Sequence, residues 1–141
     1  MEIVEIAAVQ TTSEPLSTAL LAILDNHATE TGHPWRSDQI RLEARLGDTL
    51  AGGLSGRTQY GWMEIRLLAV DPAFRGQGVG RALMRNAERH AQEAGCPGIL
   101  VETMDFQAPS FYAALGFTEA ARLPGHVPAE DRLLLRKDLT L

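Results

Sequence analysis

Apolar and polar residues alternate with a period of two over residues 40–46, where the sequence reads IRLEARL. Alternation of this kind is typical of a strand with one face toward a core and the other toward solvent. Gly47 and Asp48 follow and predict a turn. Residues 49–56 are therefore expected to return beside the first strand as the second half of a β-hairpin.

A second pattern, with apolar residues at helical spacing, predicts an amphipathic helix that begins at Val79 and ends before Gly95. Its apolar face would consist of Val79, Leu83, Met84, Ala87, Ala91 and Ala94. Similar spacing from Leu16 onwards, behind Pro15, predicts an N-terminal helix. The remaining expected elements are strands over residues 3–9, 62–70, 99–103, 117–123 and 132–139, and a short helix over 108–115.

The expected order of elements is β-α-β-β-β-α-β-α-β-β, which predicts an α/β (α+β) fold with helices covering a mixed sheet. A chain of 141 residues, 45% of them hydrophobic, suits one globular domain and is short for two. Neither an internal repeat nor a linker-like tract interrupts the pattern. We therefore expect residues 1–141 to form a single domain.

The charge balance limits the expected partners. The chain has 13 Lys and Arg against 18 Asp and Glu, a net charge of -5, which argues against a protein that binds nucleic acid through phosphate neutralisation. The first residues, MEIVEIAAV, lack the basic region of a leader, and no apolar run approaches the ~18 residues that a membrane helix needs. We expect a cytoplasmic protein with neither a membrane nor a nucleic-acid partner.

The only cysteine, Cys96, excludes an internal disulfide, and with the four histidines it offers no zinc-ligand spacing. Cys96 follows a glycine that is expected to end a helix, and no histidine lies near it in the sequence. A packing role is therefore expected for Cys96 rather than a nucleophilic one, and no metal is expected.

Residues 75–81 read RGQGVGR and lie between a predicted strand and the predicted amphipathic helix. Glycines let an anion approach the backbone amides, and the free N–H groups and the dipole of a helix N-terminus attract negative charge. The segment is therefore expected to bind a diphosphate. The structural alternative is that its glycines only form a tight turn between strand and helix.

Two common nucleotide-binding loops do not match these residues. A Walker A loop needs Lys followed by Ser or Thr after its last glycine, and Arg81 and Ala82 stand there instead. A dinucleotide fingerprint needs a third glycine and an acid at the end of the next strand, and neither of the two frames supplies the full set.

The glycine segment resembles the acyl-CoA signature of the GNAT superfamily of N-acetyltransferases, which is Arg or Gln, two residues, Gly, one residue, and Gly or Ala. Arg75, Gly78 and Gly80 match that signature. The resemblance implies a GNAT-like fold, with a mixed, mostly antiparallel central sheet flanked by helices, and it extends over roughly residues 40–139.

The surroundings of the signature are similar to the family as well. Residues 68–72 resemble the strand that precedes the family's loop, and residues 111–117 resemble its late helix and the following turn. Residues 105–109 and 124–126, which read DFQAP and PGH, are similar to a small bacterial-type acetyltransferase subgroup of unassigned acceptor.

The resemblance implies a coenzyme A site built mostly from main chain. Amides between Gln77 and Arg81 would bind the pyrophosphate, and the strand at 68–70 would pair with the pantetheine arm. Many relatives carry an Asn that contacts the coenzyme where this chain has Asp105, so no such contact is expected there. The implied coenzyme-binding residues are Leu68, Ala69, Val70, Arg75, Gly76, Gln77, Gly78, Val79, Gly80 and Arg81.

The family places a tyrosine at the position of Tyr112, so the resemblance implies that Tyr112 protonates the departing coenzyme thiolate as a general acid. A phenol with a pKa near ~10 can donate to a thiolate whose conjugate acid has a pKa near ~8.5. The alternative for Tyr112 is a core aromatic residue on a helix. A backbone amide near Val70 would stabilise the oxyanion without a metal.

An amine acceptor must lose a proton, which a carboxylate can take. Glu64 is the first candidate, because its spacing from Val70 is similar to that of the general base in lysine-modifying relatives. A strict period of two would put Glu64 on one face with Arg66, Leu68 and Val70, and a bulge, common in this family's strand, would shift it. The alternatives are an exposed or Arg66-paired Glu64, Glu102 on the next strand as the base, and water alone.

The prediction for the whole chain is an acetyl-CoA-dependent N-acetyltransferase that moves an acetyl group to a primary amine of a small molecule or peptide by direct transfer in a ternary complex. The alternative is a non-catalytic acyl-CoA-binding sensor or scaffold module. His33, Trp35, Asp38 and His126 are loop residues that are candidates for contacting the acceptor. Dimers are frequent in the superfamily, so a homodimer is compatible with the prediction.

Overall fold

The computed structural model describes residues 4–8 and 14–139. The chain divides into two compact units, Met1–Trp35 and Arg36–Leu141, and the expectation of a single domain stays a prediction. Within the described part of the first unit the helix α1 (Glu14–Glu30) is present, which confirms the helix expected from residue 16.

Residues 4–8 form no strand, so the strand expected over residues 3–9 is wrong for the part that the structure describes. Ile3 and Val9 lie outside the described residues. A strand is held by hydrogen bonds to a neighbouring strand, so an apolar run by itself does not make one. The strands that do pair all belong to the second unit.

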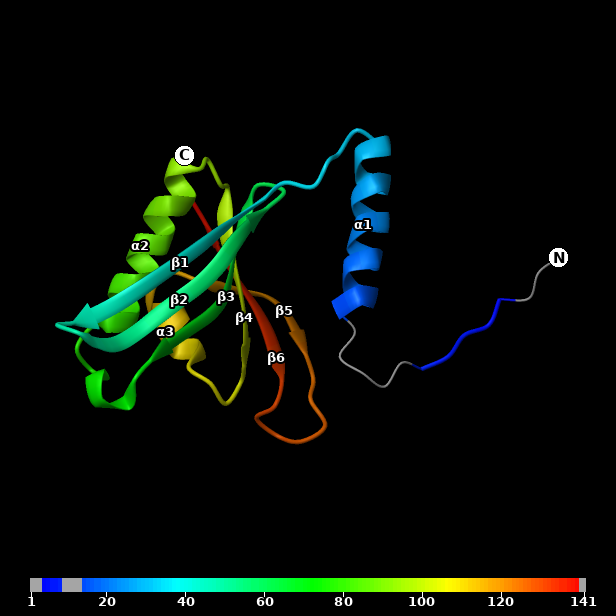
Figure 1. The fold of residues 1–141 in the computed structure, drawn as a ribbon. Coiled ribbons are helices and arrows are strands. Elements are labelled where there is room, and N and C mark those ends of the chain that lie inside the picture. The colour runs from blue at the N-terminus through cyan, green and yellow to red at the C-terminus, as the bar shows by residue number, and fades with distance from the viewer. Residues whose placement is uncertain (1–3, 9–13, 140–141) are drawn as a thin grey trace. The chain divides into compact units, whose positions relative to one another are not determined.

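The second unit is built on a six-stranded sheet with the order β1-β2-β3-β4-β6-β5 (Figure 1). Among these strands only β3 and β4 run parallel to each other, and the other neighbours are antiparallel. This confirms the expected mixed, mostly antiparallel sheet. The strands are β1 (Ser37–Leu46), β2 (Thr49–Gln59), β3 (Trp62–Val70), β4 (Gly98–Met104), β5 (Thr118–Leu123) and β6 (Arg132–Asp138).

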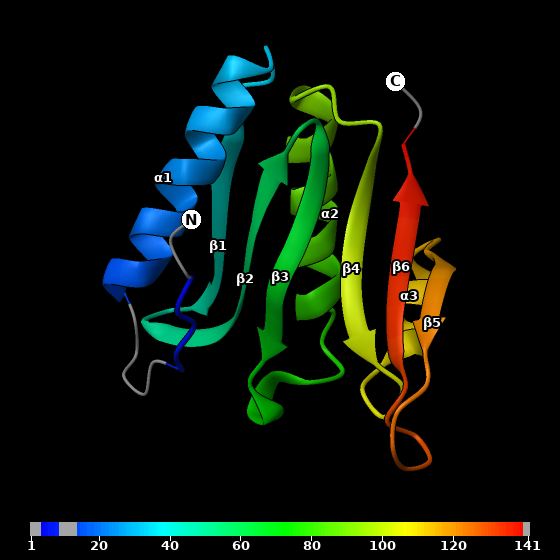
Figure 2. The ribbon, with the colours of Figure 1, turned by 90° about the vertical axis from the view of Figure 1, so that its right-hand side faces the viewer.

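Two helices, α2 (Val79–Glu93) and α3 (Pro109–Ala114), cover one face of this sheet (Figure 2). The buried side of α2 is formed by Leu83, Met84, Ala87 and Ala91, which agrees with the expected apolar face. Apolar side chains of the sheet and of α3 complete the core between the two layers. They are Leu54, Met63, Ile65, Ile99, Val101, Leu133 and Leu135 on the sheet and Tyr112 on α3, joined by Phe117 from the turn between α3 and β5.

The strand β3 contains a β-bulge at Arg66. The neighbouring strand β2 pairs with Ile65 and then with Leu67, which leaves Arg66 without a partner residue. A bulge of one residue reverses the alternation of faces along the strand. Ile65 faces the core before the bulge and Leu68 packs against the core after it. Glu64 therefore lies on the face opposite to Leu68, and the strict period-two arrangement does not hold.

The strands β3 and β4 separate beyond the bulge. Their parallel pairing ends at Ile65 and Val101, although β3 continues to Val70 and β4 continues to Met104. Past Ile65, the edge of β3 that faces β4 has no strand partner and presents main-chain donors and acceptors. The 3₁₀ turn η1 (Pro72–Phe74) then carries the chain from β3 toward α2.

Candidate active site

A cavity of ≈ 870 Å³ opens where β3 and β4 separate. Its walls are the second half of β3, the loop and first turn of α2, the end of β4, and α3. A cavity of this size suits a cofactor-sized ligand. The expected coenzyme-binding residues in its lining are Leu68, Ala69, Val70, Arg75, Gly76, Gly78, Val79, Gly80 and Arg81. Gln77 lines a smaller cavity of ≈ 260 Å³ instead, between the β1–β2 hairpin and α2.

The loop before α2 requires glycine for its backbone conformation. Gly76 has a φ of 76°, and Gly78, the N-cap of α2, has a φ of 79°. Only glycine adopts these angles at no steric cost. A Cβ at either position would meet no atom within 4 Å, so the space beside both residues is open.

The N-terminus of α2 has no side-chain cap, so its first amides are available to an anion. Arg75 and Arg81 are exposed and line the same cavity, which adds positive charge beside these amides. The geometry therefore suits the diphosphate of a ligand whose remaining part extends into the cavity.

Gly80 has a packing role. A Cβ at this position would lie 3.3 Å from Cζ of Phe111 and 3.5 Å from Cγ2 of Val70. The first turn of α2 is therefore in close contact with α3 and with the end of β3. This contact fixes the amides of α2 relative to the unpaired edge of β3.

Tyr112 lies on α3, is 9% exposed, and lines the cavity. Its ring packs against Phe111 at 5.1 Å and edge-on against Phe117 at 5.7 Å between ring centroids. Burial raises the pKa of Tyr112 above its ordinary value, so the phenol stays protonated at neutral pH and keeps a proton to donate. The position of Tyr112 is compatible with a general acid, because the residue borders the cavity, and also with a core aromatic residue, because its ring packs in the core.

The two candidate carboxylates differ in position. Glu64 pairs with Arg57 across the β2–β3 ladder, at 3.2 Å between Oε2 and Nε, and is not part of the cavity lining. The structural alternative for Glu64 was an ion pair with Arg66, and its partner in the structure is Arg57 instead. The role of Glu64 as the general base stays a prediction. Glu102 lines the cavity, together with Tyr112, and forms an ion pair with Arg132 of the neighbouring strand β6.

Glu64 and Glu102 nevertheless share one face of the sheet. Glu64 lies opposite Leu100 in the β3–β4 register, and Glu102 follows Leu100 by two residues on β4. Residues two apart on a strand point to the same side. Both carboxylates therefore face away from α2, on adjacent strands, close to where the pairing of these strands ends.

Sequence reasoning did not identify several residues of the lining. Thr103 lies at the end of β4, Gln107 lies in the segment between β4 and α3, and Arg66 is at the bulge. The only sequence signal for Gln107 was its place in the DFQAP segment that carries the subgroup resemblance. The bulge at Arg66 depends on pairing with β2, which a pattern along one strand does not reveal.

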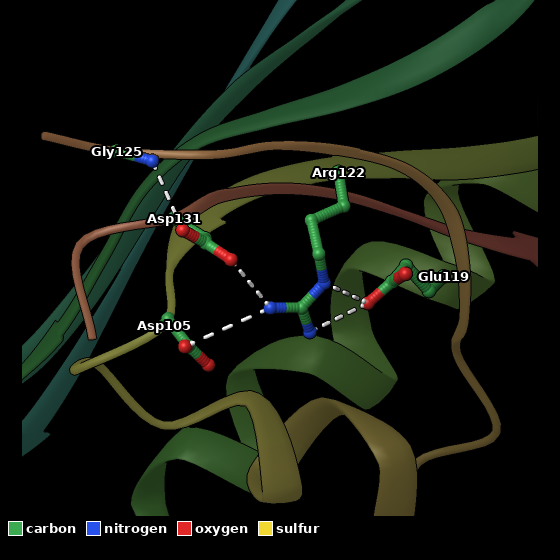
Figure 3. Close-up of polar contacts among 5 residues, drawn as sticks. All are labelled: Asp105, Glu119, Arg122, Gly125 and Asp131. Atoms are coloured by element: carbon green, nitrogen blue, oxygen red, sulfur yellow. Dashed lines mark hydrogen bonds and ion pairs between the residues drawn. The ribbon is translucent and has the colours of Figure 1, made fainter. Parts of the chain in front are cut away.

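Asp105 is part of a network around Arg122 (Figure 3). The Arg122 guanidinium lies 3.0 Å from Asp131, 2.9 Å from Glu119 and 3.7 Å from Asp105. Asp131 also accepts a 2.9 Å hydrogen bond from the amide of Gly125. Asp105 is not part of the cavity lining, and the expectation that it makes no coenzyme contact stays a prediction.

The remaining candidates are placed as follows. Cys96 is buried, and burial raises the pKa of its thiol, so it packs in the core as an unreactive side chain. His126 is exposed in the loop between β5 and β6. His33 and Trp35 belong to the first unit. Asp38 belongs to the second unit and lies on the strand β1, so its expected place in a loop is wrong. An acceptor contact by any of these residues stays a prediction.

Over residues 4–8 and 14–139, no group of three or more His, Cys, Asp or Glu side chains is arranged to hold a metal ion. None of the helices described has the length and apolar character needed to span a bilayer.

A helix end with free amides beside an unpaired strand edge is the arrangement that a coenzyme with a diphosphate and an extended arm requires, and this fold is that of an acyltransferase. Residues 5–117 match the Acetyltransferase (GNAT) family, and the chain belongs to that family. This confirms the family, the GNAT fold and the class of enzyme, an N-acetyltransferase, that the sequence led us to expect.

Three comparisons illustrate the relationship. The chain is 47% identical over 91 residues to blasticidin-S acetyltransferase of Streptomyces morookaense, which covers 64% of this chain and 67% of that protein. The structure of an acetyltransferase from Agrobacterium tumefaciens has a TM-score of 0.87 at 26% identity and covers 96% of this chain and 100% of that one. A streptothricin acetyltransferase from Bacillus anthracis, solved with acetyl coenzyme A, shares the fold with a TM-score of 0.67 at 24% identity, over 72% of this chain and 63% of that one.

Proposed function

We propose that this protein transfers the acetyl group of acetyl-CoA to the primary amine of a small molecule, by direct transfer in a ternary complex. The observation that carries the proposal is that one cavity is lined by the N-terminus of α2, by the unpaired edge of β3 and by Tyr112. These are the parts needed to bind a diphosphate, to align an extended arm, and to supply a proton.

The residues of the cavity would hold two parts of the acyl donor, its pyrophosphate and its pantetheine arm. The amides that follow Gly78, with Arg75 and Arg81, would hold the pyrophosphate. The unpaired edge of β3 at residues 68–70 would bind the amide groups of the pantetheine arm as an added strand would. When bound, the coenzyme supplies an activated acetyl thioester, close to the point where β3 and β4 separate.

Tyr112 would act as the general acid. Transfer forms a bond between the acceptor nitrogen and the acetyl carbon and breaks the bond between that carbon and sulfur. The sulfur leaves as a thiolate and takes the proton of the Tyr112 hydroxyl. The raised pKa of Tyr112 keeps that proton in place until the thiolate forms. A backbone amide near Val70 would stabilise the oxyanion.

The acceptor amine must give up a proton, and two carboxylates are candidates for taking it. Glu102 lies in the lining of the cavity that also contains Tyr112, which favours it as the base. Glu64 lies on the same face of the sheet, on the adjacent strand, and is held by Arg57. Glu64 remains the alternative, and the pH dependence of the two variants separates them.

Direct transfer is supported by the chemistry of the lining. The described residues around the cavity include no Cys, Ser, Lys or His that would form a covalent acyl intermediate. The thiol of Cys96 is buried in the core. Thr103 donates its hydroxyl hydrogen to Gln107 and is buried. An acceptor that attacks the thioester itself therefore needs no nucleophile from the protein.

A small cationic amine is the acceptor that the observations favour. The relative that is 47% identical is named for a small molecule, blasticidin-S. The chain carries a net charge of -5. A net negative charge attracts a protonated amine. A peptide amine is the other option, and the same assay tests it.

The experiment is an assay of free thiol released from acetyl-CoA across a panel of small amines and N-terminal peptides, with the product identified by mass spectrometry. Direct transfer predicts intersecting lines in initial-rate plots against both substrates. Parallel lines would contradict a ternary complex. Coenzyme binding without thiol release for any amine of the panel would favour a sensor or scaffold over an enzyme.

A further inference from the structure

Gln107 is held rigidly at the rim of the cavity. It lies between β4 and α3, where its main-chain N–H donates to the carbonyl of Met104 at 3.0 Å. Its side-chain Oε1 accepts two hydrogen bonds, one from the main-chain N–H of Met104 at 3.0 Å and one from the hydroxyl of Thr103 at 3.1 Å. An exposed glutamine usually samples many rotamers, so three bonds to one strand end are a marked constraint.

These bonds also fix which way the carboxamide faces. A main-chain N–H can only donate, so the group that meets Met104 must be the oxygen of Gln107. Both acceptor sites of that oxygen are then used. The Nε2 group carries two N–H donors, and none of the described residues accepts a hydrogen bond from them. Gln107 therefore presents a fixed, unused pair of donors at a cavity wall.

The place of Gln107 along the cavity decides what it would contact. The strands β3 and β4 are parallel, so the end of β4 is at the same edge of the sheet as Val70, where the chain leads to α2. Gln107 is thus beside the stretch between the helix end and the point where the strands separate. That is the stretch that the middle of the coenzyme arm would occupy.

The pantetheine arm contains two amide groups. When an extended arm pairs with β3, the polar groups along one edge of the arm form hydrogen bonds with that strand. The polar groups along the other edge of the arm face the wall formed by β4 and α3. The residues of that wall in the lining are Val101, Glu102, Thr103, Gln107, Ala108, Phe111 and Tyr112. Gln107 is the one that combines uncommitted N–H donors with a fixed orientation, because the hydroxyl of Thr103 is already used.

We propose that the carboxamide of Gln107 donates a hydrogen bond to an amide carbonyl of the pantetheine arm, and so is a binding residue for the acyl donor. This inference rests on the proposed function, since it requires the coenzyme in this cavity. Its energetic advantage is preorganisation: Thr103 and Met104 order the donor before the ligand arrives.

The test compares Gln107→Glu and Gln107→Met. The glutamate keeps an oxygen that can accept from Met104 and loses both N–H donors, and the methionine keeps the length and loses the donors without adding charge. Two ligands are measured for each variant. One is coenzyme A, and the other is the fragment of coenzyme A that keeps the nucleotide with its pyrophosphate and lacks pantetheine. Gln92→Glu, on the exposed side of α2, is the matched control for the added charge.

Both variants should bind coenzyme A roughly 3- to 10-fold more weakly and the fragment as tightly as the wild type, the loss expected for one neutral hydrogen bond. The KM for acetyl-CoA should rise while kcat changes little. Equal weakening of both ligands would indicate a disturbed loop and overturn the proposal. So would unchanged coenzyme affinity, or a loss confined to Gln107→Glu, which would reflect charge repulsion.

The same measurements separate this inference from the proposed function. A wild-type protein that binds coenzyme A and releases thiol, with Gln107 variants like the wild type, would overturn only the role of Gln107. A wild-type protein that binds neither coenzyme A nor the fragment would overturn both.

Discussion

Arg122 and Asp131 join two strands that the sequence separates by a loop, through an ion pair of 3.0 Å between Nη1 and Oδ2 (Figure 3). Arg122 is on β5, and Asp131 directly precedes β6. Because Asp131 also accepts from the amide of Gly125, one carboxylate fixes both ends of the loop that contains His126. Asp105, at the start of the loop that leads to Gln107, contacts the same guanidinium.

Replacement of Asp131 by Asn should lower the stability of the protein relative to the wild type, and this loss should be larger at neutral pH than in acid. The amide of Gly125 and the Arg122 guanidinium lower the pKa of Asp131 below its ordinary value. A carboxyl group with a lowered pKa stabilises the folded state fully above its unfolded pKa, near ~4, and the contribution is lost as the pH falls through the lowered value. The Tm difference between wild type and Asp131→Asn should therefore shrink from pH 7 to pH 2.

An Arg122→Gln background provides the control. One of the two causes of the lowered pKa is then absent, so Asp131→Asn should change the Tm by less and with a weaker dependence on pH. A Tm difference that stays constant across the whole pH range would contradict a role for the Asp131 charge.

Gly78→Val should weaken coenzyme binding as well as lower the stability of the protein. The φ of 79° at Gly78 is costly for any L-residue, about 1–2 kcal/mol. Gly95, at the other end of α2, has a φ of 74°, and a Cβ there would also meet open space. Gly95→Val is therefore a matched control for the backbone cost, and calorimetry with coenzyme A compares the two. Both variants should lose stability, and only Gly78→Val should lose affinity, by tenfold or more. Equal affinities would move the diphosphate site away from the N-terminus of α2.

Tyr112→Phe should reduce kcat by ~10²-fold with coenzyme affinity nearly unchanged, since it keeps the ring contacts with Phe111 and Phe117 and removes one proton donor. Tyr60→Phe, the same change in the turn between β2 and β3, should leave kcat unchanged. In the wild type, the raised pKa of Tyr112 means that the phenol does not ionise below pH ~10. Loss of the Tyr112 proton should therefore not lower kcat below that pH. An unchanged turnover for Tyr112→Phe when chemistry is rate-limiting would leave Tyr112 as a packing residue.

Those parts of the fold that follow from a local period were predictable. The apolar face of α2 and the hairpin around Gly47 are encoded within a few neighbouring residues, and the structure shows both. The glycine segment was predictable for the same reason, because positive φ and free amides are properties of a few consecutive residues. The strand expected over residues 3–9 was wrong over the described residues 4–8, because strand formation depends on a partner.

The features that depend on contacts between distant segments could not be predicted. The bulge at Arg66 arises from the register between β2 and β3, and it places Glu64 away from Leu68. The pairing of Glu64 with Arg57 depends on the same register. The fixed orientation of Gln107 depends on a buried threonine at the end of β4. Charged side chains with several partners of opposite sign in reach carry little information in the sequence about which partner they take.

A comparison of Glu102→Gln with Glu64→Gln identifies the base. If Glu102 takes the proton of the acceptor, Glu102→Gln should lower kcat/KM by ~10²-fold at neutral pH. Raising the pH should restore much of that loss, because the acceptor amine then deprotonates by itself. Glu64→Gln should show no such rescue. Loss of its ion pair with the partly exposed Arg57 should cost at most ~1 kcal/mol of stability.

Arg132→Gln separates the chemical role of Glu102 from its ion pair. Loss of Arg132 breaks the same contact on β6 and leaves the carboxylate in place, so kcat/KM should keep its wild-type pH profile apart from a small change in magnitude. The measurement is the pH profile of kcat/KM for the three variants, with the Tm of each. A rescue by high pH in Glu64→Gln and not in Glu102→Gln would assign the base to β3. Wild-type profiles for both would leave water alone as the proton acceptor, because then neither carboxylate contributes to deprotonation of the amine.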